Sequence, residues 1–259
     1  MARTSAQRKF RRGCDQVAEL LDGATEFEHS GAYEFTVEHE DRGLFEVVYR
    51  CYGEERKPIP EEWDLLAGEA IQNLRASLDH AVWAAAERPN SNTKFPIFTD
   101  SGRFESIGRG NIERVSEELR AIIEKRQPFK VAPQAPEREP LEVLRLLSNQ
   151  DKHRTLTTVA SAVGNEHVAM PENVDVSWER YGTNRMLGPG RTHLSTLVAM
   201  SSAEWSEGDV QPGFSYRVQI EGLSITTLRG IAHRVFEVLV ECETGKRPDP
   251  FGPYPLGPG

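Results

Sequence analysis

The feature that most constrains this fold is a long amphipathic stretch from about residue 60 to 88. On a helical wheel, at about 100° per residue, one side of this stretch is apolar or small throughout. The residues of that side are Ala67, Ala70, Ile71, Leu74, Leu78, Ala81 and Ala85. Pro60 and the acidic residues that follow it suit a first helical turn, where no backbone donor is needed and negative charge is favoured. The stretch therefore predicts a helix that buries one side in a core.

Four further stretches show helical periodicity and extend this helix into a bundle. They cover residues 3–21, 111–126, 139–161 and 224–243. The last of them has Ser224 where an N-cap belongs and Gly245 just beyond its end, where a left-handed residue often closes a helix. We therefore expect a helical bundle whose long members are 60–88, 139–161 and 224–243.

Alternation of apolar and polar residues indicates strands in two parts of the chain. Residues 32–52 alternate on both sides of a turn-like Glu-Asp-Arg-Gly segment and predict a hairpin. A β-rich insertion over about 165–222 contains strand-like segments at 173–178, 192–200 and 214–222. Because these strands do not alternate with helices, we expect an α+β fold: a helical bundle with an appended β-hairpin and a small antiparallel sheet.

The length and composition fit one ordinary globular domain. The chain has 259 residues, of which 38% are hydrophobic and 27% charged. We expect residues 1–246 to form a single domain and the Pro/Gly-rich residues 247–259 to form a tail. No run approaches the roughly 18 apolar residues of a membrane span, and no apolar segment follows the basic N-terminus as in a signal peptide. Three widely spaced cysteines suit a reducing compartment, so we expect a cytoplasmic protein without membrane attachment.

The charge distribution excludes one class of function and leaves another open. A net charge of −9 argues against broad binding of duplex nucleic acid, which relies on a basic face. The first twelve residues, in contrast, hold five basic side chains and no acidic one. This segment is either a solvated helix start or a local patch that steers an anionic ligand.

The side of helix 60–88 that faces away from the predicted core is mixed in character. Arg75 and His80 flank this side, about 140° apart, and Leu65 and Trp83 point to its middle. Large apolar residues among charges favour packing by a second helix or another subunit on this side. We therefore expect a homodimer whose interface includes this helix.

Arg75, Asp79 and His80 have two interpretations. In the first, Arg75 and Asp79 form a solvated i,i+4 ion pair worth about 0.3–0.5 kcal/mol. In the second, His80 is a general acid or base, and Arg75 holds a phosphate through two hydrogen bonds. RNA cleavage requires no further catalytic group, because the 2′-hydroxyl is an internal nucleophile and no metal-bound water is needed. Two such helices across a two-fold axis would line a shared groove.

A second polar motif, Ser-Asn-Gln-Asp-Lys-His-Arg, covers residues 148–154 in the middle of the helix predicted over 139–161. Asn149 and His153 are four residues apart and would share one face, and Asp151 can pair with Arg154. If this helix packs on helix 60–88, the shared face supports the site near Asn73 and His80. The alternative is a polar network that fixes the register of the bundle.

Other types of site are not indicated by the sequence. His80, Asp151 and His153 match no zinc-binding spacing, so we expect no metal ion. The chain has no glycine-rich phosphate loop, no G-x-S-x-G turn, no C-x-x-C pair and no H-E-x-x-H helix. We expect His233 and Arg234, in the last helix, to be ordinary surface residues.

The segment from Arg75 to His80 resembles the motif of the HEPN superfamily, in which an arginine is followed, after four to six residues, by a histidine late in a bundle helix. HEPN proteins are small helical domains, usually dimers, and many are metal-independent ribonucleases of toxin–antitoxin, CRISPR and anti-phage systems. More closely, residues 68–83, followed by Phe-Pro-Ile-Phe and by Leu-Ser-Asn-Gln-Asp-Lys-His-Arg, look like a widespread set of bacterial proteins of unassigned function. This closer resemblance covers about residues 60–160. The strands depart from the nearly all-helical HEPN pattern.

The resemblance implies a metal-independent RNA endonuclease of a toxin or anti-phage type, without a cofactor. Arg75 and His80 would be catalytic at a composite dimer site. The supporting residues would be Asn73, Asp79, Asn149, Asp151, His153 and Arg154. RNA such as tRNA or mRNA would be the substrate, and an antitoxin or another regulatory protein would be a partner. The alternatives are a non-catalytic HEPN-like module that binds a nucleotide or a protein, and a structural protein whose polar motifs clip the bundle together.

Overall fold

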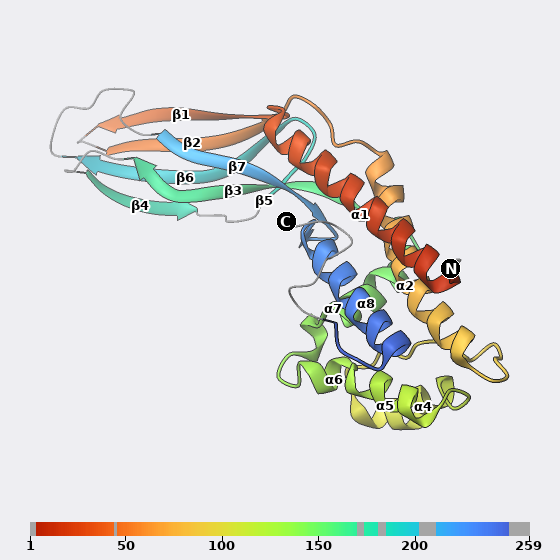
Figure 1. The fold of residues 1–259 in the computed structure, drawn as a ribbon. Coiled ribbons are helices and arrows are strands. Elements are labelled where there is room, and N and C mark those ends of the chain that lie inside the picture. The colour runs from red at the N-terminus through yellow and green to blue at the C-terminus, as the bar shows by residue number, and fades with distance from the viewer. Residues whose placement is uncertain (1–3, 44–45, 170–173, 181–184, 202–210, 249–259) are drawn as a thin grey trace. The chain divides into compact units, whose positions relative to one another are not determined.

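The computed structural model describes residues 4–43, 46–169, 174–180, 185–201 and 211–248 (Figure 1). Contacts group the chain into two compact units. The helical unit consists of Met1–Asp22, Glu61–Leu156 and Ile225–Gly259, and the strand unit of Gly23–Pro60 and Thr157–Ser224. The chain is thus a mixed α and β protein.

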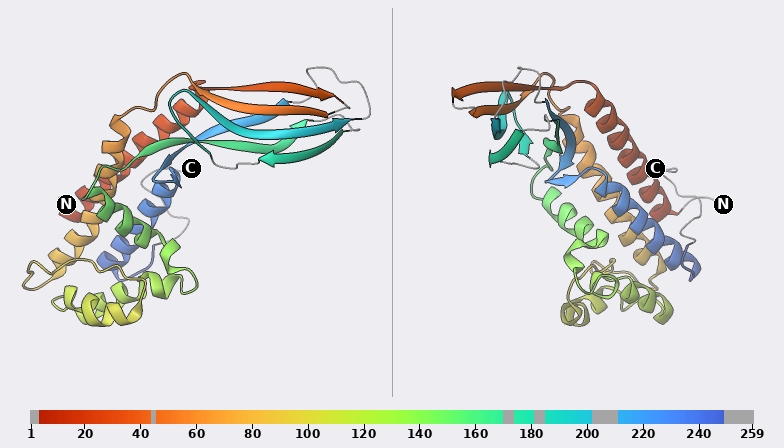
Figure 2. Two further views of the ribbon diagram at one scale, coloured as in Figure 1. Left: turned by 180° about the vertical axis from the view of Figure 1, so that it is seen from behind. Right: turned by 90° about the vertical axis from the view of Figure 1, so that its left-hand side faces the viewer.

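Four long helices dominate the helical part of the chain (Figure 2). They are α1 (Ser5–His29), whose last residues belong to the strand unit, α2 (Glu62–Ala85), α7 (Pro140–Asp151) and α8 (Thr227–Thr244). Helix α2 packs against both α7 and α8, and α7 packs against α8. The short elements between α2 and α7 are α3 (Ser101–Arg103), the π-helical η1 (Phe104–Gly108), α4 (Arg109–Asn111), α5 (Glu117–Lys125), α6 (Pro128–Val131) and the 3₁₀ turn η2 (Pro136–Arg138).

The predicted core side of α2 is confirmed from Ala67 to Leu78, but Ala81 is only half-buried and Ala85 is exposed. Ala67, Ile71, Leu74 and Leu78 have no exposed surface. Helix α1 approaches α2 closely, because a Cβ atom added at Gly13 would lie 2.9 Å from Cγ of Leu74. The glycine therefore lets the two helix backbones come close enough for α1 to cover this part of α2.

Several predicted helix boundaries are wrong. The helix predicted over 139–161 ends at Asp151, and strand β3 begins at Thr158. Threonine at 155, 157 and 158 and valine at 159 are β-branched residues, which favour a strand over a helix. The helix predicted over 111–126 begins only at Glu117, where the Ser116 hydroxyl accepts a hydrogen bond from the Leu119 N–H group.

The ends of α8 give one correction and one confirmation. The helix begins at Thr227, and Ser224, the expected N-cap, lies in the short strand β8 instead. Gly245 follows the helix in the left-handed conformation, with φ of 68°, and its N–H group donates to the Glu241 carbonyl oxygen. Glycine adopts this φ without a Cβ clash, as the sequence predicted.

Within the described ranges, the strand unit forms two four-stranded sheets (Figure 1). The first has the order β1-β2-β6-β4, and the second β5-β3-β7-β8, with every pairing antiparallel. The strands are β1 (Tyr33–Gly43), β2 (Glu46–Glu55), β3 (Thr158–Ala169), β4 (Val174–Arg180), β5 (Arg185–Leu187), β6 (Arg191–Ser201), β7 (Gln211–Ile220) and β8 (Leu223–Ser224). The predicted hairpin is confirmed as β1 and β2, but the turn predicted at residues 40–43 is wrong, because these residues belong to β1. The first sheet joins the hairpin to strands of the predicted insertion.

An aromatic cluster attaches the end of α1 to the strands. The rings of Tyr33 and Tyr216 lie 4.9 Å apart, and those of Phe27 and Tyr216 lie 6.0 Å apart. The Tyr216 hydroxyl donates to the carbonyl oxygen of Phe27 at 2.7 Å and accepts from the N–H group of Ala32 at 3.0 Å. This buried hydroxyl therefore fixes where the chain leaves the helix and enters β1.

No helix within the described ranges combines the length and the apolar character that crossing a membrane requires.

Candidate functional site

Arg75 and Asp79 do not form a solvated surface pair, but bind the backbone of the Phe-Pro-Ile-Phe segment at 95–98. The Arg75 Nη2 atom donates to the carbonyl oxygen of Phe95 at 2.7 Å and lies 3.0 Å from Asp79 Oδ1. The same carboxylate oxygen accepts the N–H group of Phe95 at 2.9 Å. The two side chains thus satisfy both backbone polar groups of Phe95, and this excludes the solvated-pair interpretation.

The guanidinium of Arg75 is held in a nearly buried position. Its side chain is 14% exposed, and burial lowers its pKa from the ordinary value, while the Asp79 carboxylate opposes that shift. Its Nη1 atom is buried and has no hydrogen-bond partner in the part of the chain that the structure describes. A buried donor without a partner is costly.

A pocket of about 330 Å³ opens beside this pair. Its walls come from α2, from residues 94–100, from the short helices α3, η1 and α4, and from α7 and the turn after it. Its basic side chains are Arg75, Lys94, Arg103, Arg145 and Lys152, and its acidic ones are Asp79, Asp100 and Glu142. The pocket thus gathers polar groups from segments that are far apart in the sequence.

His80 and Asn73 face a different neighbour, the first turns of α1. The Nδ1 atom of His80 lies 2.7 Å from the Ser5 hydroxyl oxygen. The Asn73 side-chain oxygen accepts from the Lys9 ammonium group at 3.0 Å, and its Nδ2 atom donates to Gln16 at 2.8 Å. The basic N-terminal segment therefore lies along the His80 edge of α2, whereas Arg75 faces the pocket. Within one chain, the two predicted catalytic residues, Arg75 and His80, therefore contact different parts of the protein.

The residues of the second motif, 148–154, also lie in different places. Asn149 lies in the pocket with Arg75 and Asp79, not beside Asn73 and His80. His153 is exposed in the turn after α7, so the prediction that it shares a helix face with Asn149 is wrong, because the helix ends two residues earlier. Arg154 is exposed in the same turn.

Asp151 has a structural position between helices α7 and α2. Its carboxylate accepts a hydrogen bond from Gln72 Nε2 at 2.9 Å. A Cβ atom added at Gly68 would lie 2.3 Å from Asp151 Oδ1, so any larger residue at this position would require the carboxylate to move. This part of the motif therefore joins the two helices, as the bundle-clip interpretation predicted.

The predicted exposure of large apolar residues on α2 is confirmed. Leu65 is 64% exposed and Trp83 is 48% exposed. Both lie on the side of the helix between the Arg75 edge and the His80 edge. This strip, defined by Leu65, Ala76 and Trp83, is called the α2 strip below.

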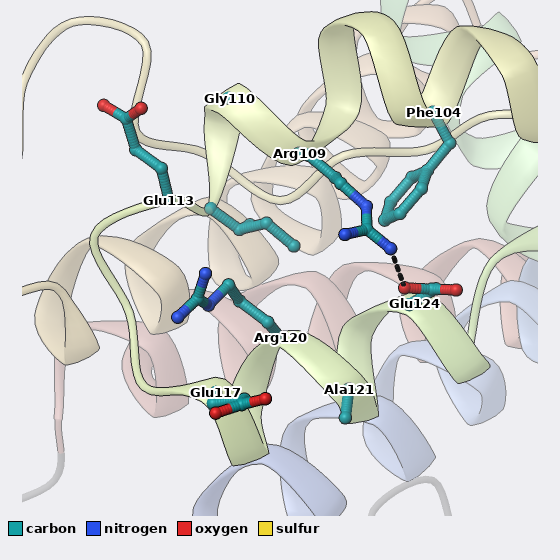
Figure 3. A pocket seen from close by; sticks show the side chains of 9 residues that line it. Phe104, Arg109, Gly110, Glu113, Glu117, Arg120, Ala121 and Glu124 are labelled. Atoms are coloured by element: carbon teal, nitrogen blue, oxygen red, sulfur yellow. Dashed lines mark hydrogen bonds and ion pairs between the residues drawn. The ribbon is translucent and has the colours of Figure 1, made fainter.

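A second hollow of about 390 Å³ lies between the short helices η1 and α4 on one side and α5 on the other (Figure 3). Its charged side chains are Arg109, Glu113, Glu117, Arg120 and Glu124. Arg109 and Glu124 form an ion pair at 3.2 Å. With three acidic and two basic side chains, this hollow does not favour an anionic ligand.

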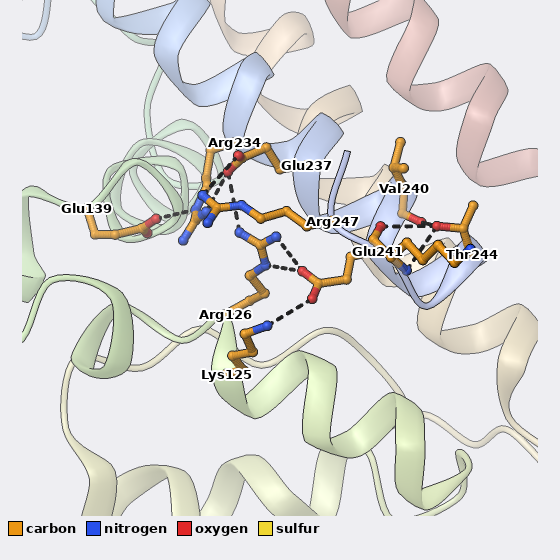
Figure 4. A network of polar contacts seen from close by, with 10 residues as sticks. Lys125, Arg126, Glu139, Arg234, Glu237, Val240, Glu241, Thr244 and Arg247 are labelled. Carbon is orange, nitrogen blue, oxygen red and sulfur yellow. Dashed lines mark hydrogen bonds and ion pairs between the residues drawn. The ribbon is translucent and has the colours of Figure 1, made fainter. Parts of the chain in front are cut away.

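A buried cluster of charges connects α8 to α7 and to the end of α5 (Figure 4). Arg234 donates to Glu139 and to Glu237, both at 2.6 Å, and Arg126 pairs with Glu237 and Glu241. The surface position predicted for Arg234 is therefore wrong. Helical periodicity could not reveal this, because a salt-bridged arginine and a solvated one have the same pattern. The cluster is enclosed by helices, and its groups are paired with one another, which indicates a structural role.

The pocket contains basic residues to which the sequence analysis gave no role, namely Lys94, Arg103, Arg145 and Lys152. Two of them had a sequence signal, because Lys94 directly precedes the Phe-Pro-Ile-Phe segment and Lys152 lies within the second polar motif at 148–154. Within the described ranges, no three or more histidine, cysteine or acidic side chains are grouped so that they could hold a metal ion. Comparisons of the chain with protein-family models, with curated proteins and with solved structures find no match.

Proposed function

We propose that this protein is a HEPN-like ribonuclease that cleaves RNA without a metal ion, at a composite site to which two copies contribute Arg75 and His80. One observation carries the proposal: Arg75 and His80 border opposite edges of the α2 strip, in which Leu65 and Trp83 are exposed. An exposed tryptophan and leucine on one helix face are typical of the core of a protein interface.

In a dimer formed through two α2 strips, Arg75 of one copy and His80 of the other copy would lie close to each other. A two-fold axis parallel to α2 puts Arg75 of one copy and His80 of the other on the same side of the interface. The two positions differ in height by about 7.5 Å, five residues at 1.5 Å each, and a phosphodiester between the two side chains spans such a gap.

The local geometry supports the chemical roles of both residues. If His80 donates its Nδ1 proton to the Ser5 hydroxyl, its Nε2 atom is left as an acceptor, which is the form that a general base needs. Arg75 is held in place by Phe95 and Asp79, so it can stabilise charge on a phosphorane without reorganisation. Lys9 lies next to Asn73 on the His80 edge and adds positive charge for the RNA backbone.

Cleavage of a labelled RNA in the presence of EDTA tests the proposal. The wild-type protein is expected to leave 2′,3′-cyclic phosphate ends, and His80→Ala and Arg75→Ala are expected to abolish cleavage. Arg120→Ala, in the hollow beside α5, is the matched control and should cleave normally. Equal cleavage by His80→Ala, or a strict requirement for a metal ion, would refute the assignment.

The dimer is tested separately. Trp83→Glu puts a charge in the centre of the α2 strip, so light scattering should show a monomer, and RNA cleavage should be lost with it. If the wild-type protein is a monomer at high concentration, the composite site is excluded.

A HEPN-like binding module without catalysis is the alternative. It is favoured by one observation, the contact of Arg75 and His80 with different surroundings within a chain. An RNA that binds but is never cut, in the assay described above, would support this alternative.

A further inference from the structure

The pocket beside Arg75 has a charge opposite to that of the whole protein. Five of its side chains are basic and three are acidic, a surplus of two positive charges, whereas the chain as a whole carries −9. A concave site whose charge is opposite to that of the surrounding protein concentrates ligands of the complementary sign. This charge distribution favours an anionic ligand.

The acidic side chains of the pocket are already occupied by protein partners. Glu142 binds Arg145 through two hydrogen bonds, at 2.5 and 2.7 Å. Asp79 pairs with Arg75 and with the backbone of Phe95. Asp100 accepts the N–H group of Arg103 at 2.8 Å and so caps the first short helix. None of these carboxylates is therefore required to neutralise the remaining cations.

Three cations remain without such a partner. Lys94, Arg103 and Lys152 form no ion pair with any residue in the part of the chain that the structure describes. They come from three separate segments, the loop after α2, helix α3 and the turn after α7. Arg75 also lines the pocket, and its guanidinium is held in place by Phe95 and Asp79. The pocket thus offers several donors, one of which is already oriented.

We propose that this pocket binds a small molecule that carries a terminal phosphate monoester. A monoester is close to a dianion at neutral pH, with a second pKa of about 6, and so matches the surplus of two positive charges. Its three terminal oxygens accept several hydrogen bonds at once, whereas a phosphodiester carries one charge and a carboxylate has only two oxygens. The volume of about 330 Å³ lies in the range of small-ligand sites.

The rest of the pocket suits the organic part of such a ligand. Phe98 is half-buried and Ile107 is exposed, so both can cover an apolar or planar group. Asn111 and Asn149 supply side-chain amides that can bind hydroxyl or ring nitrogen groups. This inference goes beyond RNA cleavage, because it needs neither His80 nor a second copy of the chain, although Arg75 belongs to both proposals.

Calorimetric titration of the full-length protein tests this binding directly. The ligands are inorganic phosphate, adenosine 5′-monophosphate, glucose 6-phosphate and, as the matched ligand without phosphate, adenosine. Both monoesters are expected to bind, and adenosine is not. A preference for one monoester would identify the organic group, and binding of inorganic phosphate alone would refute the part of the proposal that concerns the organic group. Affinity should fall at higher salt and below about pH 6, where the ester loses its second charge.

Charge reversal provides the matched variants. Arg103→Glu and Lys152→Glu should each weaken monoester binding about tenfold or more, since each removes a charge-assisted hydrogen bond and adds repulsion. Arg120→Glu, an exposed arginine of the hollow beside α5, is the control and should bind as the wild type does. No binding of any phosphate at millimolar concentration, or equal affinity in Arg103→Glu and Lys152→Glu, would refute the proposal. RNA cleavage without monoester binding would overturn this inference alone, and monoester binding without cleavage would overturn only the proposed ribonuclease.

Discussion

Replacement of Arg234 by methionine removes one of the two guanidinium groups from the buried charge cluster of the helical unit (Figure 4). The arginine side chain is 8% exposed, and that of its partner Glu139 is 2% exposed. Methionine retains much of the side-chain length but no charge, so the Glu139 carboxylate remains buried without its guanidinium partner. Glu237 loses its contact of 2.6 Å as well, but keeps Arg126 and Arg247, each at 3.5 Å.

We expect this change to lower the free energy of unfolding by about 3–5 kcal/mol, the usual cost of removing one partner of a buried ion pair. The effect should fall in the lower part of this range, because Glu139 still accepts the Leu141 N–H group at 2.7 Å. Arg109→Met is the control. Arg109 is 56% exposed and pairs with Glu105 and Glu124, so its loss should cost less than about 1 kcal/mol.

The loss of stability should depend on pH. Burial raises the pKa of Glu139 above its ordinary value of 4.5, and the charge of Arg234 opposes this rise. Without Arg234 the pKa rises further. A raised pKa in the folded state means that ionisation of Glu139 costs stability, fully above the raised pKa and not at all below 4.5. The deficit of Arg234→Met is therefore largest at pH 7 and smaller at about pH 5.

Urea denaturation followed by circular dichroism at pH 7 and at pH 5 measures both effects. If the free energy of unfolding of Arg234→Met at pH 7 is within about 1 kcal/mol of the wild-type value, the charges of the cluster do not depend on one another as buried ion pairs do. If the loss of stability is as large at pH 5 as at pH 7, or larger, the cost does not arise from the ionised Glu139 carboxylate.

Three further outcomes are expected. Gly68→Ala should destabilise the protein by about 1–3 kcal/mol in a urea titration, because the new Cβ atom would lie 2.3 Å from Asp151 Oδ1; tolerance of alanine would show that Asp151 moves freely. His153→Ala should change stability by no more than about 0.5 kcal/mol, since this side chain is exposed, and a larger loss would make His153 a bundle clip. Burial raises the pKa of Cys14 and of Cys242 to about 12, so at pH 8 both thiols should react with iodoacetamide much more slowly in the folded protein than in urea, as mass spectrometry can measure.

Local patterns in the sequence were sufficient for the elements whose form depends on neighbouring residues. The apolar side of α2, the β1–β2 hairpin and the glycine that closes α8 were all predicted from periodicity or from backbone preference. The exposure of Leu65 and Trp83 was predicted in the same way, because a helical wheel shows which residues lie away from a core.

The candidate site shows the limit of such patterns. The spacing of Arg75 and Asp79 indicated a pair, but could not indicate that both bind the backbone of Phe95. Nor could it show that Lys94, Arg103 and Lys152 lie in one pocket, since hydrogen bonds and charges between distant segments depend on how the chain packs.

The tertiary structure also decided where α7 ends and where Arg234 lies. The sequence near residue 152 allows either a longer helix or a turn into β3, and the pairing of β3 with β7 decides in favour of the strand. Arg234 lies on the side of α8 that meets Glu139, the N-cap of α7, and only this packing changes a surface-type residue into a buried one. The sequence therefore determined the local elements by itself, because they depend on backbone and periodicity. The packing of distant segments determined burial, pairing and the pocket, because the energy of a charged group depends on what surrounds it.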